Sequence, residues 1–143
     1  MIWFKPYTIA DLRALITHNS IVDHIGIEFA EVGTDFLKLR MPSDHRTHQI
    51  HGILHGGATC VLAETAGSMA SLMVVNPDTH YAVGSVITTN HLRPVKAGFV
   101  TATARAIHLG RTKHVWDILV HDDMGKLAAK SELTCAVTPK TPS

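Results

Sequence analysis

One long apolar segment restricts the fold of this chain more than any other feature. Residues 58–75 are mostly apolar, and a single acidic side chain, Glu64, lies among them. As an α-helix the segment would span about 27 Å. Asn76 and Pro77 follow it and are expected to end it. Apolar side chains surround this predicted helix on nearly every side, so the rest of the chain has to enclose it.

The segments on either side of this helix are expected to be mainly β-strands. A short helix capped by Thr8 should run to about His18, and two strands follow near residues 25–32 and 36–41. Alternating residues and turn signals predict four further strands, at residues 81–90, 98–108, 114–121 and 127–137. The pattern predicts an α+β fold, with an antiparallel sheet wrapped around the helix. One sheet leaves the far side of the helix open, which predicts a dimer or larger homo-oligomer.

Length and composition limit the class of protein. The 143 residues suit one domain, placed at residues 1–138, with a disordered tail at residues 139–143. A net charge of +1 without a basic run gives no support for nucleic-acid binding. Two distant cysteines predict reduced thiols, and no secretory signal is recognisable, so we expect a cytoplasmic protein. The apolar segment is shorter than the roughly 20 residues of a membrane span, so no membrane is expected as a partner.

A narrow polar stripe, formed by Cys60, Glu64, Ser68 and Ser71, follows one side of the predicted helix. The last three fall within about 60° of one another on a helical wheel. A stripe that faces solvent over three turns would normally contain several charges, whereas this one contains one. Two interpretations remain open. Glu64 is either a solvated surface acid or a partly buried carboxylate at a dimer seam, available as nucleophile or general base.

A turn of His55, Gly56 and Gly57 stands directly before the helix. Glycine lets a ligand approach the backbone, and the free N–H groups of a helix N-terminus favour negative charge. A turn that needs glycine only for its backbone angles is the alternative interpretation. Gly57 and Glu64 would lie roughly 10 Å apart along one helix, too far to meet at one carbonyl group. We therefore expect a shared site, in which this turn of one subunit faces Glu64 of another.

Four histidines, His45, His48, His51 and His55, precede the helix at spacings that a zinc site could use. No cysteine is close to them, and no H-E-x-x-H pattern occurs. We expect no bound metal and no cofactor.

The stretch from Gln49 to Ser68, QIHGILHGGATCVLAETAGS, resembles hotdog-fold acyl-CoA thioesterases of the 4-hydroxybenzoyl-CoA thioesterase and phenylacetate-pathway type. The likeness is greatest to 1,4-dihydroxy-2-naphthoyl-CoA hydrolases and enterobactin-pathway proofreading thioesterases. It extends over nearly the whole chain, to about Thr138. Further similar segments are residues 1–3, 41–42, 46–47, 90–93, 108–111 and 115–116.

This resemblance implies a hotdog fold, assembled as a dimer of dimers with active sites at the subunit interface. It implies that Glu64 is the nucleophile or general base and that the Gly56 N–H binds the carbonyl oxygen. Gln49 and His55 would orient the thioester, and Ser68 would help to place the attacking water. The residues that would contact coenzyme A or the rest of the substrate are His91, Arg93, Arg111 and Gly57.

The implied function is hydrolysis of an acyl-CoA or acyl-carrier-protein thioester with an aromatic or medium-length acyl group. One departure from the family concerns Ile50 and His51, where a proline and an aromatic residue are common; it affects the acyl pocket more than catalysis. A hotdog dehydratase or hydratase is the alternative enzyme, but the chain lacks the His-Phe-Pro-Gly type of entrance. A non-catalytic acyl-CoA-binding module is the alternative outside enzymes, and the intact set of Gln49, His55 and Glu64 argues against it.

Overall fold

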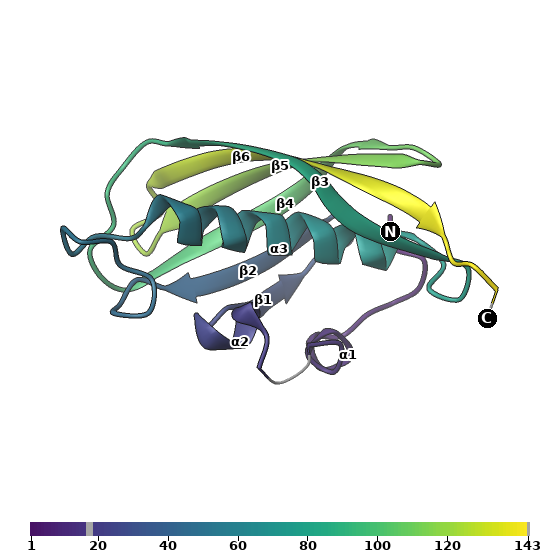
Figure 1. Cartoon of the computed structure of the whole chain (residues 1–143), viewed down its shortest axis with the longest axis horizontal. Coiled ribbons are helices and arrows are strands. Elements are labelled where there is room, and N and C mark those ends of the chain that lie inside the picture. Colours follow the sequence, from purple (N-terminus) through teal and green to yellow (C-terminus); the bar gives the residue numbers. More distant parts are fainter. Residues whose placement is uncertain (17–18, 143) are drawn as a thin grey trace.

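The long helix α3 (Gly56–Val74) lies along the inner face of a curved, six-stranded antiparallel sheet (Figure 1). The computed structural model describes residues 1–16 and 19–142. The strand order is β1-β2-β4-β5-β6-β3. The other elements are α1 (Ile9–Arg13), α2 (Ile21–His24), β1 (Glu28–Val32), β2 (Phe36–Pro42), β3 (His80–His91), β4 (Phe99–Leu109), β5 (Lys113–Asp122) and β6 (Leu127–Pro139). The predicted α+β architecture is confirmed, and each expected strand is present.

α3 is enclosed by the sheet along much of its length. Leu62, Ala66 and Ala70 on this helix are fully buried, because they pack against the inner faces of the strands. By length and composition alone, this 19-residue helix, with a mean hydropathy of 1.2 over an 18-residue window, is long and apolar enough to cross a membrane, contrary to our expectation from its length. The core helix of a folded domain can have the same length and hydropathy. Because α3 packs against the sheet, we interpret it as a core helix.

The inner face of the sheet follows the predicted alternation, with one interruption. Trp116, Ile118 and Val120 of β5 are fully buried, as expected. In β4 the alternation holds only for the first half of the strand. A β-bulge between Ala106 and His108 shifts the register with β5, and the end of β4 is exposed.

The N-terminal region differs from the prediction. Thr8 caps α1 as expected, but the helix ends at Arg13, and His18, its predicted end, lies outside the described residues. A second short helix, α2, begins after Ser20, whose hydroxyl accepts the N–H of the third helical residue. Gly26, with a φ of 73°, then turns the chain, so β1 begins at Glu28 rather than near residue 25.

The last strand is longer than predicted. Pro139 of β6 still pairs with His80, and Lys140 N–H donates to Thr79 O at 2.8 Å. The ordered chain therefore reaches into the segment that we expected to be disordered.

The two edges of the sheet differ. β1 is 5 residues long and α1 packs against it, whereas β3 is 12 residues long and, among the described strands, pairs with β6 alone. Val83 and Val86 of β3 are 50% and 59% exposed. A long apolar edge strand is a template for pairing with another chain, so β3 is the edge at which a second copy could join.

Candidate active site

The first turn of α3 leaves one backbone donor without an acceptor. His55 is the N-cap residue, and its Nδ1 accepts the Gly57 N–H at 2.7 Å. His55 O accepts the N–H groups of Ala58 and Thr59, at 3.0 and 3.2 Å. No group in residues 1–16 and 19–142 accepts the Gly56 N–H. This N–H is therefore the donor that the helix N-terminus can offer to a ligand.

The cap also defines the state of the His55 ring. A ring nitrogen that accepts a hydrogen bond bears no proton, so the proton of neutral His55 is on Nε2. The ring is exposed, which leaves Nε2–H able to donate to a bound molecule. Gly57 was expected to contact the substrate, and its N–H is already used by this cap.

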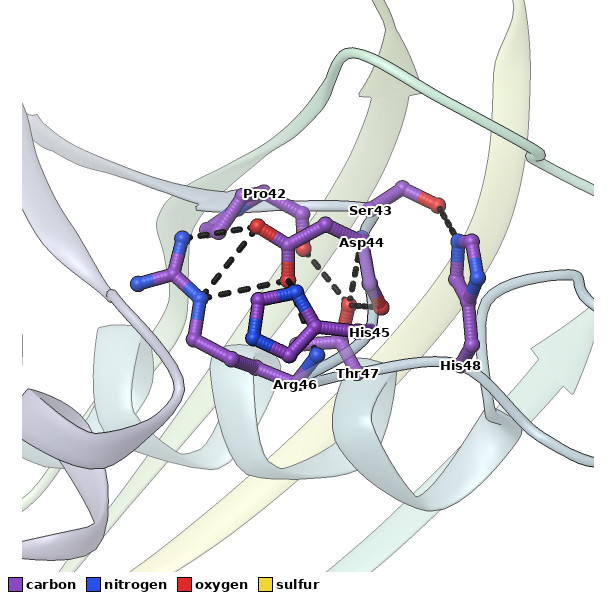
Figure 2. Close-up of polar contacts among 7 residues, drawn as sticks. All are labelled: Pro42, Ser43, Asp44, His45, Arg46, Thr47 and His48. Carbon is purple, nitrogen blue, oxygen red and sulfur yellow. Dashed lines mark hydrogen bonds and ion pairs between the residues drawn. The ribbon is translucent and has the colours of Figure 1, made fainter.

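Hydrogen bonds order the loop that follows β2 (Figure 2), and a further one connects this loop to the start of α3. Thr47 Oγ1 donates to Pro42 O at 2.7 Å, at the end of β2. The Arg46 guanidinium lies across Asp44 and lowers the pKa of that carboxyl group to about 2. Thr47 O accepts the His55 N–H at 2.8 Å. Thr47 therefore connects β2 to the helix cap, a role that sequence reasoning missed because the loop has no regular periodicity that would predict its hydrogen bonds.

The four histidines of this region have separate surroundings. His48 Nε2 lies 3.2 Å from Ser43 Oγ (Figure 2), and His55 forms the helix cap. His45 and His51 are exposed. Within the described ranges, no group of three or more His, Cys, Asp or Glu side chains is arranged to hold a metal ion.

A cavity of about 370 Å³ opens at the N-terminal end of α3. It brings together four of the predicted site residues, Gln49, Gly56, His91 and Arg93. A Cβ atom on Gly56 would lie only 2.9 Å from His91 Nε2, so glycine lets the imidazole pack against the helix terminus. The cavity therefore combines a free backbone donor, a carboxamide and cationic or polarisable side chains, a set suited to an anionic or carbonyl-containing ligand.

Glu64 lies outside this cavity, two helical turns further along α3. Eight residues separate it from Gly56, about 12 Å of helix rise. Its side chain is half-buried against Gly84 of β3 and has no hydrogen bond or ion pair with any described residue. No fully buried side-chain oxygen in the described part lacks a partner, so the unpaired carboxylate must still reach solvent. Ser68, one turn further, is half-buried as well.

The far end of the polar stripe faces the sheet of the same subunit. Ser71 is fully buried, and its Oγ accepts the Trp116 Nε1–H at 2.7 Å and lies 3.2 Å from His114 Nδ1. Cys60 Sγ lies 3.5 Å from Thr89 Oγ1 of β3. The expectation of a dimer seam is therefore wrong for the Ser71 end of the stripe, because strand β5 already covers it.

Arg111 is not near the other predicted substrate contacts in one chain. It lies in the turn between β4 and β5 and lines a cavity of about 330 Å³ with Val74 and Asn76, at the C-terminal end of α3. His91 and Arg93 lie at the opposite end, separated from it by roughly 28 Å of helix. Arg111 could join them only from another subunit.

A second, mainly apolar cavity of about 360 Å³ adjoins the C-terminal half of α3 and was not predicted. Its wall includes Met69, Leu72 and Met73 of α3, together with Tyr7, Leu15 and Tyr81.

Gly84 was also missed as a neighbour of Glu64. A glycine inside a predicted strand is a signal of close approach and could have indicated it.

Comparisons with known proteins agree on one family. Residues 51–129, 79 of the 143 residues, match the family described as the thioesterase superfamily. The proofreading thioesterase EntH of Cronobacter turicensis is 41% identical over 137 residues, which cover 96% of this chain and 98% of that protein.

Solved structures of thioesterases are similar over nearly the full length. The crystal structure of the Q49A mutant of thioesterase PA1618 from Pseudomonas aeruginosa has a TM-score of 0.95 and 47% sequence identity, covering 98% of this chain and 100% of that one. Thioesterase HI1161 from Haemophilus influenzae has a TM-score of 0.92 and 44% identity, covering 97% and 96%.

Proposed function

Since the chain belongs to the thioesterase superfamily and is a thioester hydrolase with the hotdog fold, we propose that it cleaves acyl-CoA thioesters at a site shared by two subunits. The observation that supports this most strongly is the unpaired Gly56 N–H at the start of α3, in a cavity that also contains Gln49. The relatives described above are named thioesterases, which argues against the alternatives of a dehydratase, a hydratase or a non-catalytic binding module.

The Gly56 N–H is the proposed donor to the thioester carbonyl oxygen. That oxygen gains negative charge when the carbonyl carbon is attacked, and a fixed backbone donor at a helix N-terminus stabilises it. Loss of one such donor typically raises the barrier by about 2.7–4 kcal/mol. His55 Nδ1 accepts the neighbouring Gly57 N–H, so the Gly56 N–H remains as the donor for the substrate.

Glu64 is the proposed nucleophile or general base. As a base, it takes a proton from water while the water oxygen bonds to the carbonyl carbon; the C–S bond then breaks and the thiolate leaves. As a nucleophile, a carboxylate oxygen bonds to that carbon, the thiolate leaves, and water cleaves the resulting anhydride. Its lack of a partner within the described residues supports either role, because neither an ion pair nor a hydrogen bond lowers its reactivity.

Three further side chains would orient the reactants. Gln49 Oε1 accepts the His51 N–H, which leaves the Gln49 amide N–H groups to donate to the thioester. His55 Nε2–H is a second donor beside Gly56. Ser68, one turn after Glu64, would help to place the attacking water.

Coenzyme A is the proposed thiol carrier, with an acyl-carrier-protein thioester as the alternative. His91 and Arg93 at the cavity rim would bind its phosphates or pantetheine, and Arg111 would contribute from another subunit. Gly57, next to this rim, would contact the same part of the substrate through its backbone carbon rather than its N–H.

The free edge of β3 supports the shared site. If two β3 strands pair antiparallel about a two-fold axis, the two α3 helices also run antiparallel. The polar cavity of one subunit then faces the partner's Glu64 and the apolar cavity that contains Met69 and Leu72, which would take an aromatic or medium-length acyl group. Two such dimers would form the proposed homotetramer, in the cytoplasm.

Thiol release from a panel of thioesters tests the proposal. Benzoyl-CoA, a hydroxynaphthoyl-CoA, straight-chain acyl-CoA and the same acyl groups on a carrier protein should be compared at equal concentration. The proposal predicts free thiol from the CoA series, with the highest kcat/KM for an aromatic or medium acyl group. Thiol release only from the carrier-protein series would contradict CoA as the carrier.

A further inference from the structure

We propose that Gly84 is a positioning residue for Glu64: the missing side chain at this point of β3 forms the notch that holds the carboxylate. The inference rests on the proposed role of Glu64 in hydrolysis and adds a second residue to it. Gly84 belongs to the edge strand, on the side that faces α3.

The space beside Gly84 is filled by the Glu64 side chain. A Cβ atom on Gly84 would overlap Glu64 Oε1, and it would lie 3.2 Å from Cδ and 3.3 Å from Cγ. All three of the nearest atoms therefore belong to one side chain, and its carboxylate occupies the place where any other residue would have its first carbon.

Backbone conformation does not explain a glycine here. The described glycines with positive φ are Gly26, Gly52, Gly98 and Gly125, and Gly84 is not among them. An alanine could adopt the same backbone angles, so the requirement at Gly84 is for space rather than for conformational freedom.

The pairing of β3 with β6 opposes movement of the strand away from α3. Gly84 pairs with Cys135 of β6, which is fully buried, and the pairing continues on both sides of it. A β-bulge follows directly, and Ser85 Oγ within it donates to Thr134 O at 3.1 Å. A methyl group added at Gly84 would therefore displace the flexible end of Glu64 and leave the strand in place.

Packing is all that holds the carboxylate, because Glu64 has no polar partner among the described residues. Its rotation away from an added methyl group would relieve the overlap without unfolding the protein. A displacement of about 1 Å at a reacting group can reduce the rate on the order of 100-fold. Gly84→Ala should therefore lower turnover while the fold persists.

The first test measures kcat, KM and thermal stability of Gly84→Ala. We expect kcat to fall about 10- to 100-fold with KM within about twofold, because the carboxylate moves while the binding cavity does not. The matched control is Gly33→Ala in the β1–β2 turn, where the three atoms nearest to an added methyl group likewise belong to one side chain, the partly exposed Phe36. The control should keep the wild-type kcat. A Gly84→Ala variant that keeps the wild-type kcat, or one that does not fold, would overturn the proposal.

A double-mutant cycle separates positioning from a general structural effect. In a Glu64→Gln background, Gly84→Ala should not change the residual rate, since the carboxylate that it displaces is gone. In a Glu64→Asp background its effect should be small, since the shorter side chain leaves room for the methyl group. If Gly84→Ala lowered kcat by the same factor in all backgrounds, the positioning role would be overturned. High activity of Glu64→Gln alone would instead contradict the proposed function.

Discussion

Glu64 and Ser71 lie on the same side of α3, but they differ in burial and in hydrogen-bond partners. Glu64 is half-buried against Gly84, and no described residue forms a hydrogen bond or ion pair with it. Ser71, seven residues later, is fully buried and lies within hydrogen-bond distance of Trp116 and His114.

The difference separates a group kept available for chemistry from one that belongs to the core. A buried polar group without a partner destabilises the fold, so Ser71 is tolerated because the indole N–H and the imidazole are arranged around it. Glu64 avoids the same cost by remaining in reach of solvent beside the free edge of β3. Helical periodicity puts both residues on one stripe, but only the surroundings decide their roles.

The largest expected effect is the loss of activity in Glu64→Gln. The amide has nearly the same shape but is neither a base nor a nucleophile, so kcat should fall about 10²- to 10⁴-fold. Thermal unfolding should be unchanged, because the carboxylate has no partner to lose. The control is Glu132→Gln on the exposed face of β6, which should match wild type in both measurements.

Ser71→Ala should show the reverse pattern. Removing the hydroxyl leaves the buried Trp116 N–H without an acceptor, which should lower the free energy of unfolding by about 1–3 kcal/mol. Urea unfolding measures this loss, and kcat of the folded variant should stay close to wild type. A variant with full stability but little activity would show that Ser71 belongs to the site after all.

A smaller effect is expected in the pH dependence of stability. Burial, with a minor contribution from His108, lowers the pKa of His114 below its usual value of 6.5. The folded state therefore favours the neutral ring, and this contribution to stability is complete above about pH 6.5 and is lost as the pH falls below it. Urea unfolding from pH 7.5 down to pH 5 should show a slope that His114→Gln reduces. An identical slope in the variant would place the titrating group elsewhere.

The sequence predicts those parts of the fold that depend on local patterns. The long helix and the strands follow from periodicity and turn residues, so α3 and β3–β6 lie close to where they were expected. The short helix α2 was missed because it depends on one cap, Ser20, and on the turn at Gly26. Periodicity gives such a short helix almost no signal.

The sequence predicts which residues could belong to the candidate site, but it does not predict how they are arranged in space. Gln49, Gly56, His91 and Arg93 do line one cavity, whereas Arg111 lies at the other end of α3. The partners of Ser71 are 43 and 45 residues away, and the contact of Glu64 with Gly84 depends on how α3 packs on β3. Such contacts between distant segments require the three-dimensional arrangement.

The shared site is tested most directly by mixing two variants that are each expected to lose most of their activity, Glu64→Gln and Gln49→Ala, in equal amounts under conditions that exchange subunits. If Gln49 of one subunit acts with Glu64 of the other, each mixed dimer contains one intact site. Half of the dimers would be mixed, so thiol release should recover to about a quarter of the wild-type rate. A mixture no more active than its components would contradict a site built from two subunits.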